Sequence, residues 1–101
     1  MTNQESSTAI MAQLKPTLDA FAKKYAKRDL TDVFRRELAE MLDVALRALG
    51  YNDRLIRVVE PQPNGDTTFL VFTRDDRDNA DKKFTMTTIT IRGRVVPEEI
   101  Q

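Results

Sequence analysis

Residues 30–51 read LTDVFRRELAEMLDVALRALGY, and this stretch decides the fold. At about 100° per residue, its apolar side chains fall on one broad face of a helix and its charged side chains on the opposite face. A face this wide is typical of a helix that packs on a core, and it exceeds a coiled-coil seam. The strands that follow must therefore cover an apolar face made of Phe34, Leu38, Met41, Leu42, Ala45, Ala48 and Leu49, while Arg36, Glu40, Asp43 and Arg47 face away.

The ends of this helix are also marked in the sequence. The Thr31 hydroxyl can accept a backbone N–H of the first turn, and Asp32 suits the positive end of the helix dipole. Gly50 follows the last apolar residue and suits the left-handed position after a helix. We therefore expect the helix to begin next to Thr31 and to end before Gly50.

An earlier apolar stripe predicts a first helix over about residues 8–27, preceded by a flexible tail at residues 1–7. Pro16 lies inside the stripe and removes a backbone donor. Either one helix is kinked at Pro16, or Pro16 begins a helix that follows a short helical segment. The unbroken stripe favours the kink; its members are Met11, Leu14, Leu18, Phe21 and Tyr25.

Only three residues, 28–30, link this helix to the next, so the two helices are expected to form an antiparallel or sharply angled pair. Basic side chains gather just before the link, where the negative end of the helix dipole favours cations. A solvated helix end explains them better than an anion or nucleic-acid contact. They are Lys23, Lys24, Lys27 and Arg28.

After Gly50 the apolar period changes from 3.6 to 2, which indicates strands. Strands are expected at residues 54–60, 66–73 and 84–92, with a turn at Asn64-Gly65 and a charged, solvated loop between the last two. Because sequential strands usually pair, we predict an α+β domain in which two N-terminal helices precede a three-stranded antiparallel β-meander. The domain is expected to span residues 8–96, with a second flexible tail at residues 97–101.

The middle strand is apolar on both faces, which is typical of a strand that is covered on both sides. Phe69 and Val71 point one way, whereas Leu70 and Phe72 point the other. Two arrangements are compatible with this pattern. Either the two helices cover opposite faces of the sheet, or both helices share one face and a second copy of the protein covers the other.

Composition limits the function classes. The chain has 101 residues, enough for one modest core, and its 16 basic and 16 acidic residues cancel. A free nucleic-acid binder usually has a basic excess, whereas a neutral chain lacks the repulsion that opposes self-association. The absence of cysteine and histidine excludes disulfides, thiolate nucleophiles and the commonest general base and metal ligand. No signal peptide or membrane helix is present in the sequence, so we expect a cytoplasmic protein with no membrane contact.

Metal, cofactor and catalytic sites are not expected. The acidic loop offers clustered oxygens, but the glycine and glutamate of a calcium-binding EF-hand loop are missing, and basic neighbours neutralise it. No glycine-rich phosphate loop occurs. Glu37, near the border of the apolar face, is the one carboxylate expected to be partly buried with a raised pKa. The loop residues considered are Asp75, Asp76, Asp78, Asn79 and Asp81, beside Arg74, Arg77, Lys82 and Lys83.

The candidate partner-binding residues are arginines that lie on or beside the predicted strands. If they shared one face, they would form a basic platform for phosphate. Such a sheet usually also exposes aromatic side chains for base stacking, whereas Phe69, Phe72 and Phe84 are better used in the core of so small a domain. The five arginines are Arg54, Arg57, Arg74, Arg92 and Arg94.

The sequence therefore predicts a small non-enzymatic protein that binds a protein partner and self-associates as a homodimer, as an inhibitor, adaptor or assembly component of the kind that phages and plasmids encode. The alternatives are a nucleic-acid-associated protein that uses the strand arginines, and a small-ligand binder or carboxylate-based enzyme. Residues 20–33, AFAKKYAKRDLTDV, resemble the opening helices of the nuclear-transport-factor-2-like fold. The next helix is too long and the sheet too short for that fold, so we assign no family.

Overall fold

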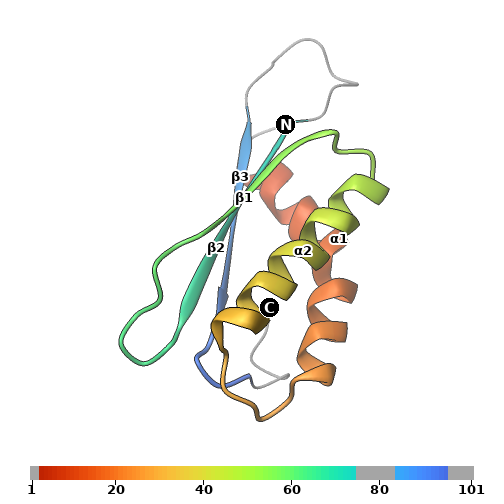
Figure 1. Cartoon of the computed structure of the whole chain (residues 1–101). Coiled ribbons are helices and arrows are strands. Elements are labelled where there is room, and N and C mark those ends of the chain that lie inside the picture. The colour runs from red at the N-terminus through yellow and green to blue at the C-terminus, as the bar shows by residue number, and fades with distance from the viewer. Residues whose placement is uncertain (1–2, 75–83, 96–101) are drawn as a thin grey trace.

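The structure is a computed structural model that describes residues 3–74 and 84–95. It confirms the predicted α+β class, with two helices followed by a three-stranded antiparallel sheet in one small domain (Figure 1). The sheet order is β1-β2-β3, so the doubly apolar strand is central. The elements are α1 Asn3–Lys24, α2 Asp32–Ala48, β1 Asp53–Val58, β2 Thr67–Arg74 and β3 Thr85–Ile91.

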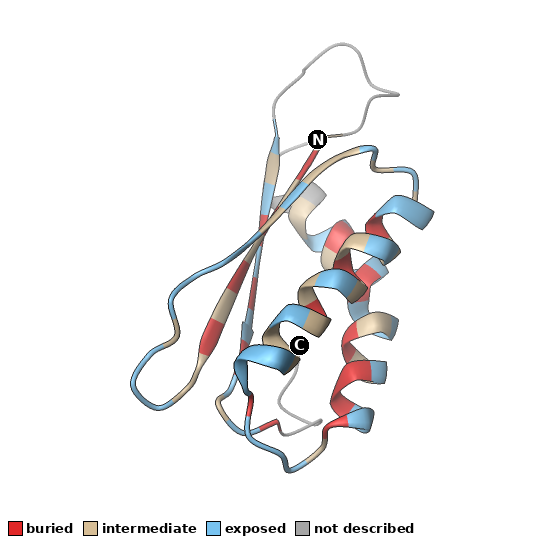
Figure 2. Cartoon of the chain, viewed as in Figure 1, coloured by how far each residue is buried: buried red, intermediate tan, exposed pale blue. Residues whose placement is uncertain are grey.

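The two helices lie antiparallel to each other on the same face of the sheet (Figure 1). Helix α1 packs on β3 and helix α2 packs on β1. Of the two arrangements compatible with the sequence, the one that places the helices on opposite faces is therefore excluded. Buried residues line the sides of the helices and sheet that face each other (Figure 2), among them Leu14, Leu18, Phe21, Leu38, Leu42, Phe69, Val71, Ile89 and Ile91.

Helix α1 is longer than the apolar stripe predicts. It begins at Asn3, so residues 3–7, expected to belong to a flexible tail, are helical. Pro16 lies inside this one helix, which therefore does not begin anew at Pro16. The kink at Pro16 stays a prediction, and the expected tail at residues 97–101 lies outside the described residues.

Helix α2 has both of the predicted ends. The Thr31 hydroxyl accepts the Phe34 N–H at 3.3 Å, and Gly50 adopts a positive φ of 96°. The Tyr51 N–H then donates to the Leu46 carbonyl at 3.0 Å, as in a Schellman motif. The Thr31 cap and the left-handed Gly50 therefore set the start and the end of α2 where the sequence predicted them.

The buried face of α2 is rotated from the predicted one. Leu38 and Leu42 are fully buried as expected, but so is Leu46, whereas Ala48 is exposed. The rotation follows from packing, because α2 contacts α1 on one side and β1 on the other. A helix that touches two elements buries a face set by both of them, which the periodicity of one helix does not specify.

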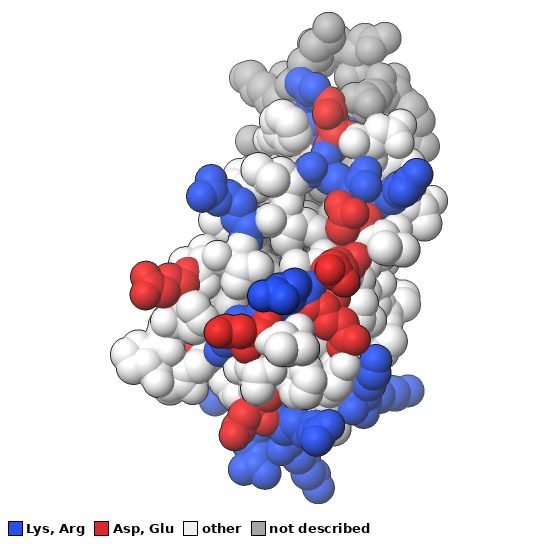
Figure 3. Space-filling model, in the orientation of Figure 1, with Lys and Arg blue, Asp and Glu red and all other residues white. Residues whose placement is uncertain are grey.

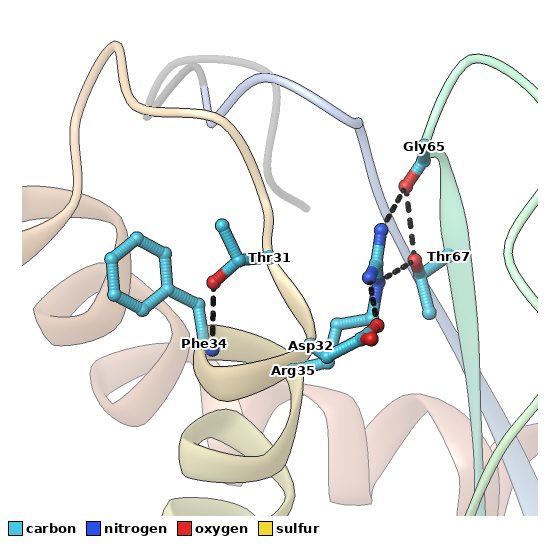
Figure 4. Close-up of polar contacts among 6 residues, drawn as sticks. All are labelled: Thr31, Asp32, Phe34, Arg35, Gly65 and Thr67. Atoms are coloured by element: carbon cyan, nitrogen blue, oxygen red, sulfur yellow. Dashed lines mark hydrogen bonds and ion pairs between the residues drawn. The ribbon is translucent and has the colours of Figure 1, made fainter.

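Arg35 ties α2 to the sheet at one end of the molecule (Figure 4). Its Nε donates to the Thr67 hydroxyl at 2.7 Å and its Nη2 donates to the Gly65 carbonyl at 3.2 Å. Its Nη1 pairs with Asp32 at 2.7 Å. With 12 % of its side chain exposed, Arg35 is a structural residue that connects the helix start to the β1–β2 turn.

The segment after β3 closes the same end of the molecule. The Gly93 N–H donates to the Asp66 carboxylate at 2.8 Å, and its carbonyl accepts from the Leu30 N–H at 2.7 Å. Asp29 and Arg94 form an antiparallel bridge. The β1–β2 turn, the segment after β3 and the interhelical link are thus held together side by side.

Thr87 on β3 has a buried hydroxyl with no hydrogen-bond partner among the described residues. Because an unpaired buried hydroxyl costs about 1–3 kcal/mol, we expect Thr87→Val to stabilise the domain by about 1 kcal/mol. That gain corresponds to a rise in Tm of roughly 4 °C or more for a domain of this size. Thermal unfolding followed by circular dichroism measures it.

Thr67 provides the matched control, since it is equally buried on the same face of the sheet. Its hydroxyl accepts from Arg35 and donates to the Gly65 carbonyl at 3.0 Å, so Thr67→Val should destabilise the domain by about 1–2 kcal/mol. If Thr87→Val lowered the Tm as Thr67→Val does, the Thr87 hydroxyl would not be unpaired.

Candidate functional site

No helix or strand of the described residues covers the second face of the sheet, here called the open face (Figure 1). Its side chains follow from the alternation of each strand. On β2 every second residue is buried under the helices, which leaves Leu70 and Phe72 on the open face. The register aligns Phe72 with Leu55 on β1 and with Met86 on β3. A straight apolar row therefore crosses all three strands.

Apolar side chains dominate this part of the open face. Leu55, Met86 and Phe84 are 54 %, 52 % and 44 % exposed, beside the half-buried Leu70 and Phe72. These five residues form what we call the apolar patch. A contiguous exposed apolar surface on a small domain is typical of a binding site, because its contact with water is unfavourable in free energy and a partner can remove that contact.

Charged residues border the apolar patch. Arg74 forms an ion pair with Asp53 across β1 and β2, and its Nε donates to the carboxylate at 2.9 Å. The Arg74 guanidinium also lies 4.9 Å from the centre of the Phe84 ring. Arg57, opposite Leu70, is exposed. An apolar centre with a charged rim is the usual arrangement of a protein–protein interface.

The five candidate arginines do not share one face. Arg57 and Arg74 lie on the open face, and Arg92 follows β3 in the same phase. Arg54 points to the helix side, where it donates to the two Asp43 carboxylate oxygens at 2.7 and 3.3 Å. Arg94 lies beside the interhelical link, in the bridge with Asp29.

Basic side chains gather at the end of the molecule that carries the interhelical link (Figure 3). The tertiary structure brings Arg94 to Lys23, Lys27 and Arg28, and all four are exposed. Lys24 differs, because its Nζ lies 3.3 Å from the Glu37 carboxylate. This basic end is distinct from the apolar patch.

Glu37 is partly buried as predicted, but the predicted rise in its pKa is wrong. Hydrogen bonding with Tyr25 lowers the pKa of Glu37, and the Lys24 ammonium lowers it further. The contact of Lys24 with Tyr25, followed by its contact with the Glu37 carboxylate, raises the pKa of Lys24. The carboxylate is therefore held ionised in a structural pair between α1 and α2, which does not suit a general acid at neutral pH.

A metal site in this chain needs grouped acidic side chains, and a membrane-spanning helix needs a long apolar stretch. The acidic loop, residues 75–83, lies outside the described residues, and within them no three acidic side chains are grouped to hold a metal ion. None of the described helices contains a stretch that is both long and apolar enough to cross a membrane.

Sequence reasoning anticipated the open face in part. The alternation placed Leu70 and Phe72 on the face away from Phe69 and Val71, but Leu55 joins the patch only through the β1–β2 register. The expectation that Phe72 and Phe84 are used in the core is wrong, because Phe72 is only half-buried on the open face and Phe84 is 44 % exposed. No family model, no curated protein and no solved structure matches this chain.

Proposed function

We propose that this chain is a small non-enzymatic accessory protein that binds a protein partner through the apolar patch and self-associates. The observation that carries the proposal is the row Leu55, Phe72 and Met86, in which Leu55 and Met86 are exposed and Phe72 is half-buried on the isolated chain. Covering it removes apolar surface from water at a gain of roughly 25 cal/mol per Å². A protein surface offers the shape and the apolar character that such a gain requires.

Two further observations support a binding role over catalysis and over nucleic acid. The candidate acid Glu37 is ionised by its contacts with Tyr25 and Lys24, and the chain has no cysteine or histidine. Arg54 and Arg74 are each engaged by a carboxylate of the same chain, so the strand arginines do not form a free platform for phosphate. Protein binding through the open face accounts for the exposed apolar patch, which catalysis or nucleic-acid binding would leave unexplained.

Site-specific photo-cross-linking tests the proposal. We expect benzoylphenylalanine at Thr88, which is exposed on the open face beside Leu70, to give a discrete protein adduct in the cells that express the chain. The same group at Val44, on the outer surface of α2, should give none. The variant Leu55→Asp should remove the Thr88 adduct and leave the circular dichroism spectrum unchanged. Absence of an adduct at Thr88, or an equal adduct at Val44, would contradict the proposal.

A further inference from the structure

We infer that the partner is a second copy of this chain, packed open face to open face about a two-fold axis that runs across the strands through Leu55, Phe72 and Met86. This inference rests on the proposed function and specifies the occupant of the apolar patch. The three residues are direct neighbours in the β1–β2 and β2–β3 registers. An axis along this row brings each of them against its own counterpart and joins two apolar rows into one core.

The charges on β1 select this axis. Asp53 precedes Leu55 by two residues and Arg57 follows it by two, so the open side of the strand reads acid, apolar, base. Rotation about the row inverts the order along the strand and places Asp53 opposite Arg57 of the second copy. Both such contacts in the dimer are between opposite charges, and no two like charges meet on this strand.

The other possible in-plane axis, parallel to the strands, has no such complementarity. It would lay β1 of one copy over β3 of the other, so Arg57 would face Thr88 and Asp53 would face Phe84. Arg57 would then be desolvated without an ionic partner, which is unfavourable, whereas Asp53 would keep only its pair with Arg74 of the same chain. The axis across the strands also sets the aliphatic stem of Arg74 against Leu70, and Phe84 against Thr88, of the second copy, while the Arg74 guanidinium keeps its pair with Asp53 of its own chain.

The size of the surface sets the expected affinity. Strands about 4.8 Å apart that rise about 3.3 Å per residue give the open face a footprint of roughly 15 by 23 Å. Such a footprint buries on the order of 1,000 Å² over both copies, the lower end for a specific interface. The net charge of zero adds no overall repulsion. We therefore expect a reversible dimer with a Kd on the order of 10 µM.

A charge-swap experiment tests the axis as well as the partner. In Arg57→Asp, Asp53 of each copy meets an aspartate, and in Asp53→Arg, Arg57 of each copy meets an arginine. Each variant alone should dimerise at least 10-fold more weakly than the wild type in sedimentation velocity. An equimolar mixture should form a heterodimer at least about 5-fold tighter than either variant alone, because both contacts between the copies then join opposite charges. Full wild-type affinity is not expected, since Asp53→Arg also removes the pair with Arg74 of the same chain.

The matched control is Arg47→Asp, which makes the same charge change at an exposed position of α2 and should leave dimerisation unchanged. If the wild type dimerises but mixing the two variants does not raise the affinity above that of either variant alone, the proposed axis is wrong. If the wild type has the mass of a single chain at millimolar concentration, the partner is not a second copy of this chain. In that case a Thr88 adduct with a different protein would leave protein binding through the apolar patch standing and would remove only the self-association, whereas no adduct would remove both.

Discussion

Replacement of Gly93 by alanine is expected to destabilise the domain by about 3 kcal/mol or more, a large part of the 5–15 kcal/mol that is typical of such domains. A Cβ built on Gly93 would lie 2.2 Å from the Asn64 carbonyl oxygen and 3.0 Å from the Gly65 Cα. Both neighbours are backbone atoms of the β1–β2 turn. No rotamer change relieves this clash, so the backbone itself has to shift.

Gly93 has little freedom to shift, because hydrogen bonds hold it from two directions. Its N–H is bonded to Asp66 in the turn and its carbonyl to Leu30 in the interhelical link. Movement of Gly93 away from the turn lengthens its bond to Asp66 and disturbs its bond to Leu30. We therefore expect the cost of Gly93→Ala to appear as unfolding of the whole end of the molecule.

Chemical denaturation with urea measures this cost, and Gly50→Ala serves as the matched control. Gly50 has a positive φ, but a Cβ added there would meet no atom within 4 Å, so alanine should cost only about 1–2 kcal/mol of backbone strain. A Gly93→Ala variant as stable as Gly50→Ala would show that the two backbones do not approach each other as described.

The second large effect is expected for Arg35→Met, which should lower the free energy of unfolding by about 2–3 kcal/mol. Hydrogen bonds to a charged group are worth about 1.5–3 kcal/mol, and this change removes the contacts to Thr67 and Gly65 together. The Asp32 contact adds little, because that carboxylate is 89 % exposed. The Thr67 hydroxyl keeps its bond to the Gly65 carbonyl, which limits the loss.

Arg36→Met is the control for this prediction, since Arg36 is the exposed neighbour on α2 and should change stability by less than about 0.5 kcal/mol. Arg35→Lys should recover less than half of the loss, because an ammonium lacks the planar fork that reaches Thr67 and Gly65 at once. Amide exchange should speed up around the β1–β2 turn in Arg35→Met. Equal stability of the Arg35→Met and Arg36→Met variants would contradict a structural role for Arg35.

The candidate site was predictable only as far as single strands allow. Alternation along β2 already places Leu70 and Phe72 on the face away from Phe69 and Val71, because the side-chain period of a strand is two. The pairing of Arg54 with Asp43 was not predictable, since it depends on how α2 crosses β1. For the same reason the strand arginines could not be sorted into structural and exposed ones before the packing was known.

The sequence by itself determined the order of the elements and the two ends of α2. Thr31, Gly50 and the Asn64-Gly65 turn act through their own backbone and nearest neighbours, so their effects are local and can be read directly. Tertiary structure alone decided that both helices share one face, that Arg35 and Gly93 hold one end together, and that Leu55, Phe72 and Met86 lie in one exposed row. These features depend on register and packing between segments that are distant in the chain, which local periodicity does not encode.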